Sequence, residues 1–136
     1  MAIFATSLTA ASTPTPSLDI AVSGLRNMKG NVLACATAVP RHFPDCSKDP
    51  NAAKITVAAA RAKSFAVSVP ADGTYAIALL HDENSNRKMD MALMFPKEGF
   101  GFSNNPAVIT GPPRFKSAAF VVAGDTRVAI KMKYMF

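Results

Sequence analysis

Tryptophan is absent from the chain, and charged residues make up only 18% of it, whereas hydrophobic residues make up 49%. A low charge content combined with a high apolar content excludes an intrinsically disordered protein. No stretch approaches the ~18 to 20 consecutive apolar residues that a membrane-spanning helix requires, so no membrane span is expected. At 136 residues, the chain has the length of one domain that buries a core without metals or crosslinks.

Dense basic clusters are also missing, because no run of basic residues is longer than Arg87-Lys88. Nucleic-acid-binding proteins usually combine arginine clusters with stacking aromatic residues, so no nucleic-acid partner is expected. The formal net charge is nevertheless +6, and the sequence pI is about 9.6. We therefore expect an anionic neighbour such as an envelope glycan or an acidic protein, with a merely solvated basic surface as the alternative.

Residues 1–17 have the composition of a leader rather than of a folded element. Residues 1–8 are mostly apolar or small, and further small residues and a Ser-Thr-Pro-Thr-Pro spacer follow them. This order is typical of the end of a secretory signal peptide and predicts a periplasmic or secreted protein. The apolar part is short and no Lys or Arg precedes it, so we expect either a start further upstream or a truncated leader. A disordered N-terminal tail is the alternative.

A zinc site is not expected, because His42 and His81 are the histidines available beside the two cysteines and further ligands would be needed. Ten residues separate Cys35 from Cys46, and the segment 40–45 between them is rich in turn-forming residues. A disulfide at the base of this loop is expected in an oxidising compartment. By the chain-entropy model it would contribute roughly 2 to 3 kcal/mol. Two unrelated buried thiols are the alternative.

The sequence shows no sustained helical periodicity. Instead it contains short segments in which apolar residues alternate with polar or small ones, separated by Gly, Pro, Asn and Asp. This pattern is typical of an all-β domain, and the turn signals favour about seven strands in a two-layer antiparallel β-sandwich over residues 18–136. Residues 118–122 and 127–134 are expected to form a closing hairpin. Phe100 and Phe102 would add a short strand or plug the core. The other expected strands are residues 18–22, 31–39, 55–60, 65–69 and 74–80.

The segment 81–90, His-Asp-Glu-Asn-Ser-Asn-Arg-Lys-Met-Asp, concentrates the polar chemistry of the chain and follows an apolar strand. Oxygen-bearing side chains at alternating positions are what calcium takes from a loop, and no other cofactor is indicated. The loop is incomplete by EF-hand standards, because Arg87 replaces the glycine of position six and Leu93 the glutamate of position twelve. Asx-turns that shape a hairpin tip are therefore favoured, and calcium binding is the alternative. The expected ligands are Asp82, Asn84, Asn86, Asp90 and Glu98, with Glu83 as a substitute carboxylate.

A nucleophile motif is missing as well, since no serine lies in one and Cys35 is expected in the disulfide. A small hydrolase that uses His81 and a neighbouring carboxylate is the alternative function. His81 follows a strand, in which successive side chains point to opposite faces, and this position favours a hydrogen-bonded strand-end residue over a general base. We therefore expect no enzymatic activity.

Two motifs together give the chain a family resemblance. They are the segment 73–84, Gly-Thr-Tyr-Ala-Ile-Ala-Leu-Leu-His-Asp-Glu-Asn, and the segment 96–105, Pro-Lys-Glu-Gly-Phe-Gly-Phe-Ser-Asn-Asn. With an N-terminal strand that ends in a Gly-Leu-Arg-Asn turn, the chain resembles, over about residues 18–136, the bacterial exported proteins catalogued as domain of unknown function 2141. The resemblance implies a signal peptide and a sandwich related to transthyretin-like or immunoglobulin-like modules, and it implies no activity. Ser85 and Arg87 replace glycines that are usual in the family's loop.

A non-catalytic binding or structural module of the cell envelope is the function that these observations favour. Binding residues collect on loops that a rigid scaffold positions, so the contact surface is expected at one end of the sandwich, in residues 81–90 and 96–106. Electrostatic docking on the face of Lys131 and Lys133, together with Arg87-Lys88, is a further alternative. The expected contact residues are His81, Glu83, Phe100, Phe102 and Asn104.

Overall fold

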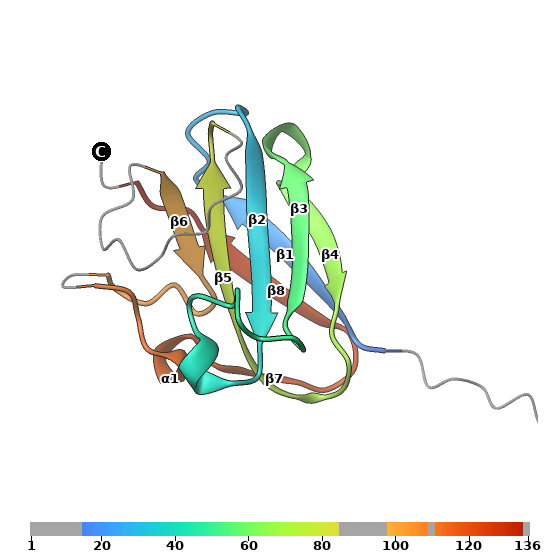
Figure 1. Cartoon of the computed structure of the whole chain (residues 1–136). Coiled ribbons are helices and arrows are strands. Elements are labelled where there is room, and N and C mark those ends of the chain that lie inside the picture. Colours follow the sequence, from blue (N-terminus) through green and yellow to red (C-terminus); the bar gives the residue numbers. More distant parts are fainter. Residues whose placement is uncertain (1–14, 85–97, 109–110, 135–136) are drawn as a thin grey trace, which may run out of the picture.

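Two facing β-sheets make up the protein (Figure 1). The computed structural model describes residues 15–84, 98–108 and 111–134. This part of the chain contains eight strands, so the expected all-β two-layer sandwich is confirmed. The strands are β1 (Ser17–Ser23), β2 (Asn31–Thr37), β3 (Ala53–Ala58), β4 (Ser64–Ser68), β5 (Gly73–Asp82), β6 (Gly99–Phe102), β7 (Phe120–Val122) and β8 (Thr126–Lys131). The short helices are η1 (Pro40–His42), η2 (Ala59–Arg61) and α1 (Phe115–Ala118).

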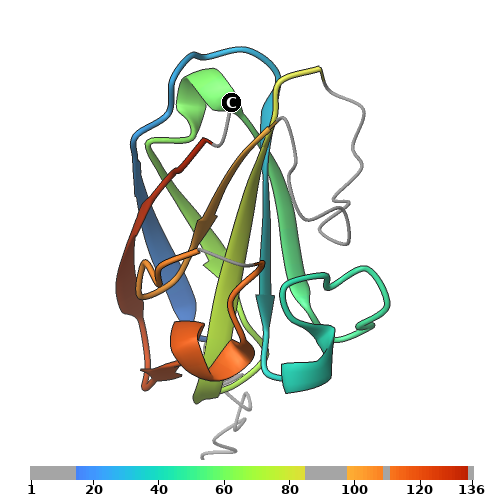
Figure 2. The ribbon, with the colours of Figure 1, turned by 90° about the vertical axis from the view of Figure 1, so that its left-hand side faces the viewer.

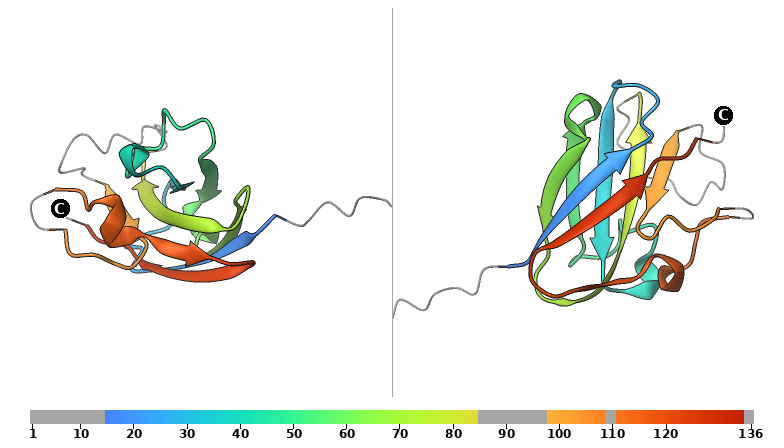
Figure 3. Two further views of the ribbon diagram at one scale, coloured as in Figure 1. Left: turned by 90° about the horizontal axis from the view of Figure 1, so that it is seen from below. Right: turned by 180° about the vertical axis from the view of Figure 1, so that it is seen from behind.

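The smaller sheet has the order β4-β1-β8 and the larger one β3-β2-β5-β6, with β7 paired to the first residues of β5. Seen from behind, β1 and β8 cross obliquely in front of the larger sheet (Figure 3). The described strand pairs are antiparallel except β1 and β8, which run parallel with Ile20 opposite Val128. The expectation of antiparallel sheets therefore fails for this pair. Both strands begin at the same end, where the Ser17 N–H donates a hydrogen bond to Asp125 Oδ1 over 2.9 Å.

The predicted closing hairpin is wrong. β7 pairs with β5, whereas β8 pairs with β1, so the turn at residues 123–125 carries the chain from one sheet to the other. Residue 118, expected in a strand, is the last residue of helix α1. Apolar alternation gives the face that a strand buries but not the strand with which it pairs, and this explains the error.

The main core lies between the sheets and follows the alternation of the strands. Leu18, Ile20 and Val22 of β1 face this core, and the residues between them are exposed. The near-continuous apolar sequence of β2 predicts burial on both faces, and β2 is indeed buried on both. Its outer side belongs to a second cluster that covers the outer face of the larger sheet. This cluster contains Leu33, Ala76, Ala78, Leu80, Phe100, Phe102 and Ala118, packed against Phe43, Val108 and Phe115.

Strand β6 confirms the expected short strand around Phe100 and Phe102. Both rings point into the outer cluster, whereas Gly99 and Gly101 face β8 and the segment after it. A Cβ atom on Gly101 would lie 2.7 Å from Cγ2 of Ile130, and one on Gly99 would collide with the ring of Tyr134. The Gly-Phe-Gly-Phe sequence thus lets the end of the chain approach β6 closely. The backbones of Phe100 and Lys133 exchange two hydrogen bonds of 2.9 and 2.8 Å at this edge.

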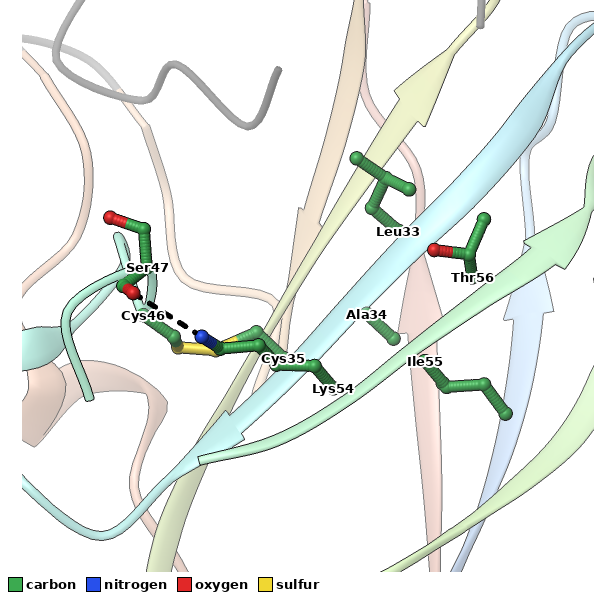
Figure 4. A pocket seen from close by; sticks show the side chains of 8 residues that line it. All are labelled: Leu33, Ala34, Cys35, Cys46, Ser47, Lys54, Ile55 and Thr56. Atoms are coloured by element: carbon green, nitrogen blue, oxygen red, sulfur yellow. Dashed lines mark hydrogen bonds between the residues drawn. A yellow bond between two sulfur atoms is a disulfide. The ribbon is translucent and has the colours of Figure 1, made fainter. Parts of the chain in front are cut away.

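Cys35 of β2 and Cys46 form the expected disulfide, with their Cα atoms 6.3 Å apart (Figure 4). The bond fixes the loop between η1 and β3 to the outer face of the larger sheet. It borders a hollow of about 350 Å³, in which Lys54 Nζ donates a hydrogen bond to the Ser47 carbonyl over 3.4 Å. A second anchor is the buried Asp49, whose Oδ2 accepts a hydrogen bond from the Thr37 hydroxyl over 2.6 Å.

Replacing both cysteines with alanine is expected to lower the free energy of unfolding by roughly 2 to 3 kcal/mol, because the unfolded chain gains the entropy of an open loop. Urea unfolding of the wild-type and double-alanine proteins measures the difference. Dithiothreitol, which reduces the bond once urea has unfolded the chain, is expected to cause a similar loss in the wild type and to leave the double-alanine protein unchanged. Equal stability of all these samples would mean that the bond does not constrain the unfolded chain.

Candidate functional site

A group of polar side chains occupies the end of the sandwich where β5 ends and β6 begins, at the top of Figure 1. The end of β5, the turn between β1 and β2, and the segment after β8 meet here. We call this group the His81 cluster, and it consists of Arg26, His81, Asp82, Glu83, Glu98 and Tyr134.

Gly30 brings the β1–β2 turn against the end of β5. Its φ is +64°, a left-handed conformation that favours glycine, and a Cβ atom on it would collide with the carbonyl oxygen of Asp82. Asn31, the next residue, pairs with Asp82 in the ladder between β2 and β5. The close contact therefore fixes the position of residues 26–29 relative to His81.

His81 is fully buried, and both of its ring nitrogens have partners. Nε2 lies 2.7 Å from the carbonyl oxygen of Lys29, and Nδ1 lies 2.7 Å from the hydroxyl of Tyr134. A carbonyl only accepts, so Nε2 carries the hydrogen, and in the neutral ring Nδ1 accepts from the Tyr134 hydroxyl. That hydroxyl in turn accepts the N–H of Arg26 over 3.1 Å. Every donor and acceptor in this chain of bonds is then satisfied.

Arg26 and Glu83 form an ion pair beside the imidazole. Arg26 Nε donates to Glu83 Oε1 over 2.5 Å, and Asn27 Nδ2 donates to the same oxygen over 3.2 Å. The hydrogen bond from Arg26 holds the pKa of Glu83 below its ordinary value. The Arg26 guanidinium also lies 4.5 Å from the centre of the Tyr134 ring, in cation–π contact. The ion pair is therefore fixed in geometry, while its side chains keep 34% and 24% of their surface exposed.

Asp82 and Glu98 form a second, carboxyl–carboxyl pair. Burial raises the pKa of Glu98, and the negative charge of Asp82 and a hydrogen bond between the two carboxyl groups raise it further, as does the charge of Glu83. A hydrogen bond between two carboxyl groups requires one proton. Glu98 therefore holds its proton more tightly than a free carboxyl group does, beside the fully buried Asp82.

This pair gives stability a pH dependence that can be isolated by Glu98→Gln. Because the folded-state pKa of Glu98 lies above its ordinary value of 4.5, the folded protein binds this proton more tightly than the unfolded chain does. Stability from this group is complete below 4.5 and is lost as the pH rises through the folded-state pKa. Glutamine is neutral at every pH and still donates to Asp82, so the variant is expected to be more stable near neutral pH by up to about 1 kcal/mol.

Urea unfolding of both proteins across a pH series measures this difference, and groups common to both cancel. The advantage of Glu98→Gln is expected to vanish below the ordinary value of 4.5. An advantage of the same size at acidic pH would show that the cause is packing rather than the charge of Glu98.

The structure brings together only some of the residues expected at the site. Glu83 and Glu98 lie with His81 and Asp82, and Asn84 follows at the same end. Asn86 and Asp90 lie outside the described residues, as do Arg87-Lys88 and residues 1–14. In the part of the chain that the structure describes, no three His, Cys, Asp or Glu side chains are grouped so as to hold a metal ion.

Residues 98–106, the described part of the expected contact segment 96–106, do not form one loop at one end, and their role as a contact surface stays a prediction. β6 carries them along the sheet, with Gly99 opposite His81 and Phe102 opposite Ala78. Phe100 and Phe102 are buried in the outer cluster. Asn104, beyond the far end of β6, has a φ of +65° and donates from Nδ2 to the Ala119 carbonyl over 2.7 Å. These three residues therefore have structural contacts, and Asn104 lies at the other end of β6 from His81.

Sequence reasoning did not foresee Arg26 and Tyr134 as partners of His81. The Gly-Leu-Arg-Asn turn was noticeable in the sequence, but the contacts of Arg26 and His81 with Tyr134 span 108 and 53 positions. The two lysines of the expected basic face differ in their exposure to solvent. Lys131 is exposed, whereas Lys133 Nζ donates to the Pro106 carbonyl over 3.2 Å and is half-buried.

The fold and the His81 cluster place this chain among small two-layer β-sandwich proteins. The polar side chains of the cluster form hydrogen bonds and ion pairs mainly with one another. None of the helices within residues 15–84, 98–108 and 111–134 has the length and apolar character needed to cross a membrane. The chain belongs to a bacterial family described as "Uncharacterized protein conserved in bacteria (DUF2141)", which matches residues 20–131. The resemblance is thereby confirmed. No curated protein and no solved structure matches the chain.

Proposed function

We propose that this protein is an exported, non-catalytic binding or structural module of the bacterial cell envelope. One observation carries the proposal: both nitrogens of His81, the best candidate for a general base, are bonded inside the protein to Lys29 and Tyr134. A general base must lie within hydrogen-bonding reach of the group that it deprotonates, and the imidazole of His81 is fully buried. The carboxylates beside His81 are engaged as well, Glu83 with Arg26 and Asp82 with Glu98.

The disulfide supports the exported location. Structural disulfides form and persist in oxidising compartments and are rare in the bacterial cytosol. Cys35 and Cys46 are both buried, so reductants have little access to the bond in the folded protein. This argument and the leader-like composition of residues 1–17 together support a periplasmic or secreted location.

The rim of the His81 cluster is the contact surface that we propose for envelope components. Arg26 and Glu83 are held in one geometry by Tyr134 and Asn27 yet remain partly exposed. Preorganised charged groups on a rigid scaffold lose little side-chain entropy on binding, and this favours recognition. An anionic glycan or an acidic protein fits the net charge of +6.

Co-sedimentation tests the proposal. Wild-type protein is incubated with purified peptidoglycan sacculi and, separately, with isolated bacterial membranes, at low and at moderate salt. Arg26→Ala with Glu83→Ala is expected to reduce sedimentation several-fold, whereas Arg127→Ala, an exposed charge on the far sheet, should leave it unchanged. Failure of the wild type to sediment with either fraction would reject the proposal. Turnover of a chromogenic ester that disappears in a folded His81→Asn variant would establish the hydrolase instead.

Calcium binding at this end stays a prediction. Asp82 and Glu98, two of the expected ligands, lie beside each other, and a divalent cation would compete with the proton that the raised pKa of Glu98 favours. Millimolar calcium is expected to raise the melting temperature of the wild type and to release protons, and Glu98→Gln is expected to weaken both effects. A wild-type melting temperature that calcium leaves unchanged would reject the site.

A further inference from the structure

A second surface with binding geometry lies at the opposite end of the sandwich from the His81 cluster. Helix α1 and the turn η1 lie side by side there, at the lower end of the molecule in Figures 1 and 2. Between them is a groove of about 500 Å³. It is lined by Pro40, Phe43, Pro44, Pro112, Pro113, Arg114, Phe115 and Lys116.

The walls of this groove are rigid. Proline has a fixed φ and no backbone N–H, so its four prolines hold the two segments in extended or turn conformations. The ring of Phe43 packs edge-to-face against Phe115, with centroids 6.2 Å apart, and against Phe102, with centroids 5.8 Å apart. Phe102 belongs to the outer cluster. The aromatic part of the groove is thus anchored to the larger sheet and exists before any ligand binds.

The charge of the groove has one sign. Arg114 and Lys116 line it and are exposed, and Arg41, also exposed, lies on η1 beside Pro40. None of the eight lining residues carries a carboxylate. Asp45 follows Pro44 in the chain, and its Oδ1 accepts a hydrogen bond from the Ser47 N–H over 2.9 Å. Three cations against this one carboxylate leave the groove and its rim positive.

We propose that this groove binds an extended acidic peptide segment that contains proline, with the peptide's carboxylates on Arg114 and Lys116 and its pyrrolidine rings on the Pro-Phe walls. Proline-rich segments are already extended and dock in aromatic-lined grooves at little entropic cost. A glycan fits less well, because its hydroxyl groups both donate and accept hydrogen bonds. The side chains that line the groove offer the donors of Arg114 and Lys116 but no acceptor. This inference goes beyond the proposed function, which concerns the other end of the molecule.

A fluorescence-anisotropy titration tests the proposal with a labelled peptide of about twelve residues that alternates proline and glutamate. The wild-type protein is expected to bind it, and Arg114→Ala with Lys116→Ala to weaken binding by about tenfold. The matched control is Arg127→Ala with Lys131→Ala, which removes the same charge from the exposed outer face of the smaller sheet. This control is expected to keep wild-type affinity within about twofold.

Each remaining outcome overturns the proposal. An equal loss in both double variants would mean attraction by net charge alone. Polyglutamate of equal length that binds as tightly would mean that the proline and phenylalanine walls take no part, and tighter binding of polygalacturonate would indicate a glycan site. No binding by the wild type also overturns it. The co-sedimentation of the Arg26 and Glu83 variant is independent of these results, so the two proposals can fail separately.

Discussion

Gly30→Ala is expected to lower the free energy of unfolding by at least about 3 kcal/mol. Gly30 has a φ of +64°, which costs an L-residue free energy by itself. The added Cβ would also collide with the carbonyl oxygen of Asp82 and lie 2.7 Å from that of Glu83. Both are backbone atoms at the end of β5, and they cannot move away without disturbing the ladder between β2 and β5.

Gly124→Ala provides the matched control for this experiment. Gly124 has a φ of +69°, nearly the same as Gly30, but a Cβ atom on it would meet nothing within 4 Å. Its substitution is expected to cost only the conformational strain, about 1 kcal/mol. Urea unfolding of the two variants therefore separates strain from collision. Equal losses would mean that the β1–β2 turn does not rest on β5 as described, and the geometry of the His81 cluster would then need revision.

The faces of the strands could be predicted from the sequence, because alternation records which side chains meet the core. Leu18, Ile20 and Val22 are buried as their spacing indicates, and the continuous apolar sequence of β2 matches burial on both faces. The pairing of strands could not be predicted in the same way. The turn at 123–125 resembles a hairpin turn, but β7 and β8 join different sheets, and nothing local encodes a partner a hundred positions away.

The candidate site could likewise be predicted only in its local part. His81, Asp82 and Glu83 are adjacent in sequence, so their proximity needed no structure. Their environment depends on contacts with residues far away in the sequence, and no local pattern predicts those contacts. Tyr134 reaches His81 because the glycines of β6 let the segment after β8 approach this strand closely. The alternation of glycine and phenylalanine is visible in the sequence, but its purpose can be interpreted only when the neighbouring segment is known.

Several residues in the two motifs that carry the family resemblance have structural contacts in this chain. The Ser103 hydroxyl accepts the Ile77 N–H over 2.9 Å and donates to the Ala118 carbonyl over 2.5 Å, which fixes α1 to β5. Asn105 Oδ1 accepts the Lys131 N–H over 2.8 Å and so ties the end of β6 to β8. His81 belongs with them by its burial and its bonds. The motifs therefore specify how the two sheets and α1 are joined, and binding specificity is expected from exposed residues outside these contacts.

His81→Phe follows from this view and is expected to lower the free energy of unfolding by about 3 kcal/mol. Phenylalanine fills a similar volume but offers no nitrogen, so the Lys29 carbonyl loses its donor and the Tyr134 hydroxyl loses its acceptor. Tyr134→Phe removes the second of these bonds and also the acceptor of the Arg26 N–H, and it is expected to cost about 1 to 2 kcal/mol. Urea unfolding of the two variants measures both losses.

Combining His81→Phe with Tyr134→Phe isolates the energy of the bond between the two side chains. Because the bond between His81 and Tyr134 is lost in each single variant, the combined loss is expected to fall short of the sum by about 1 kcal/mol. Nitrogen-15 spectra of the wild-type imidazole should also show the hydrogen on Nε2, as the Lys29 carbonyl requires. Additive losses, or a hydrogen on Nδ1 alone, would mean that the imidazole is not fixed by these bonds. His81 would then again be available to act as a base.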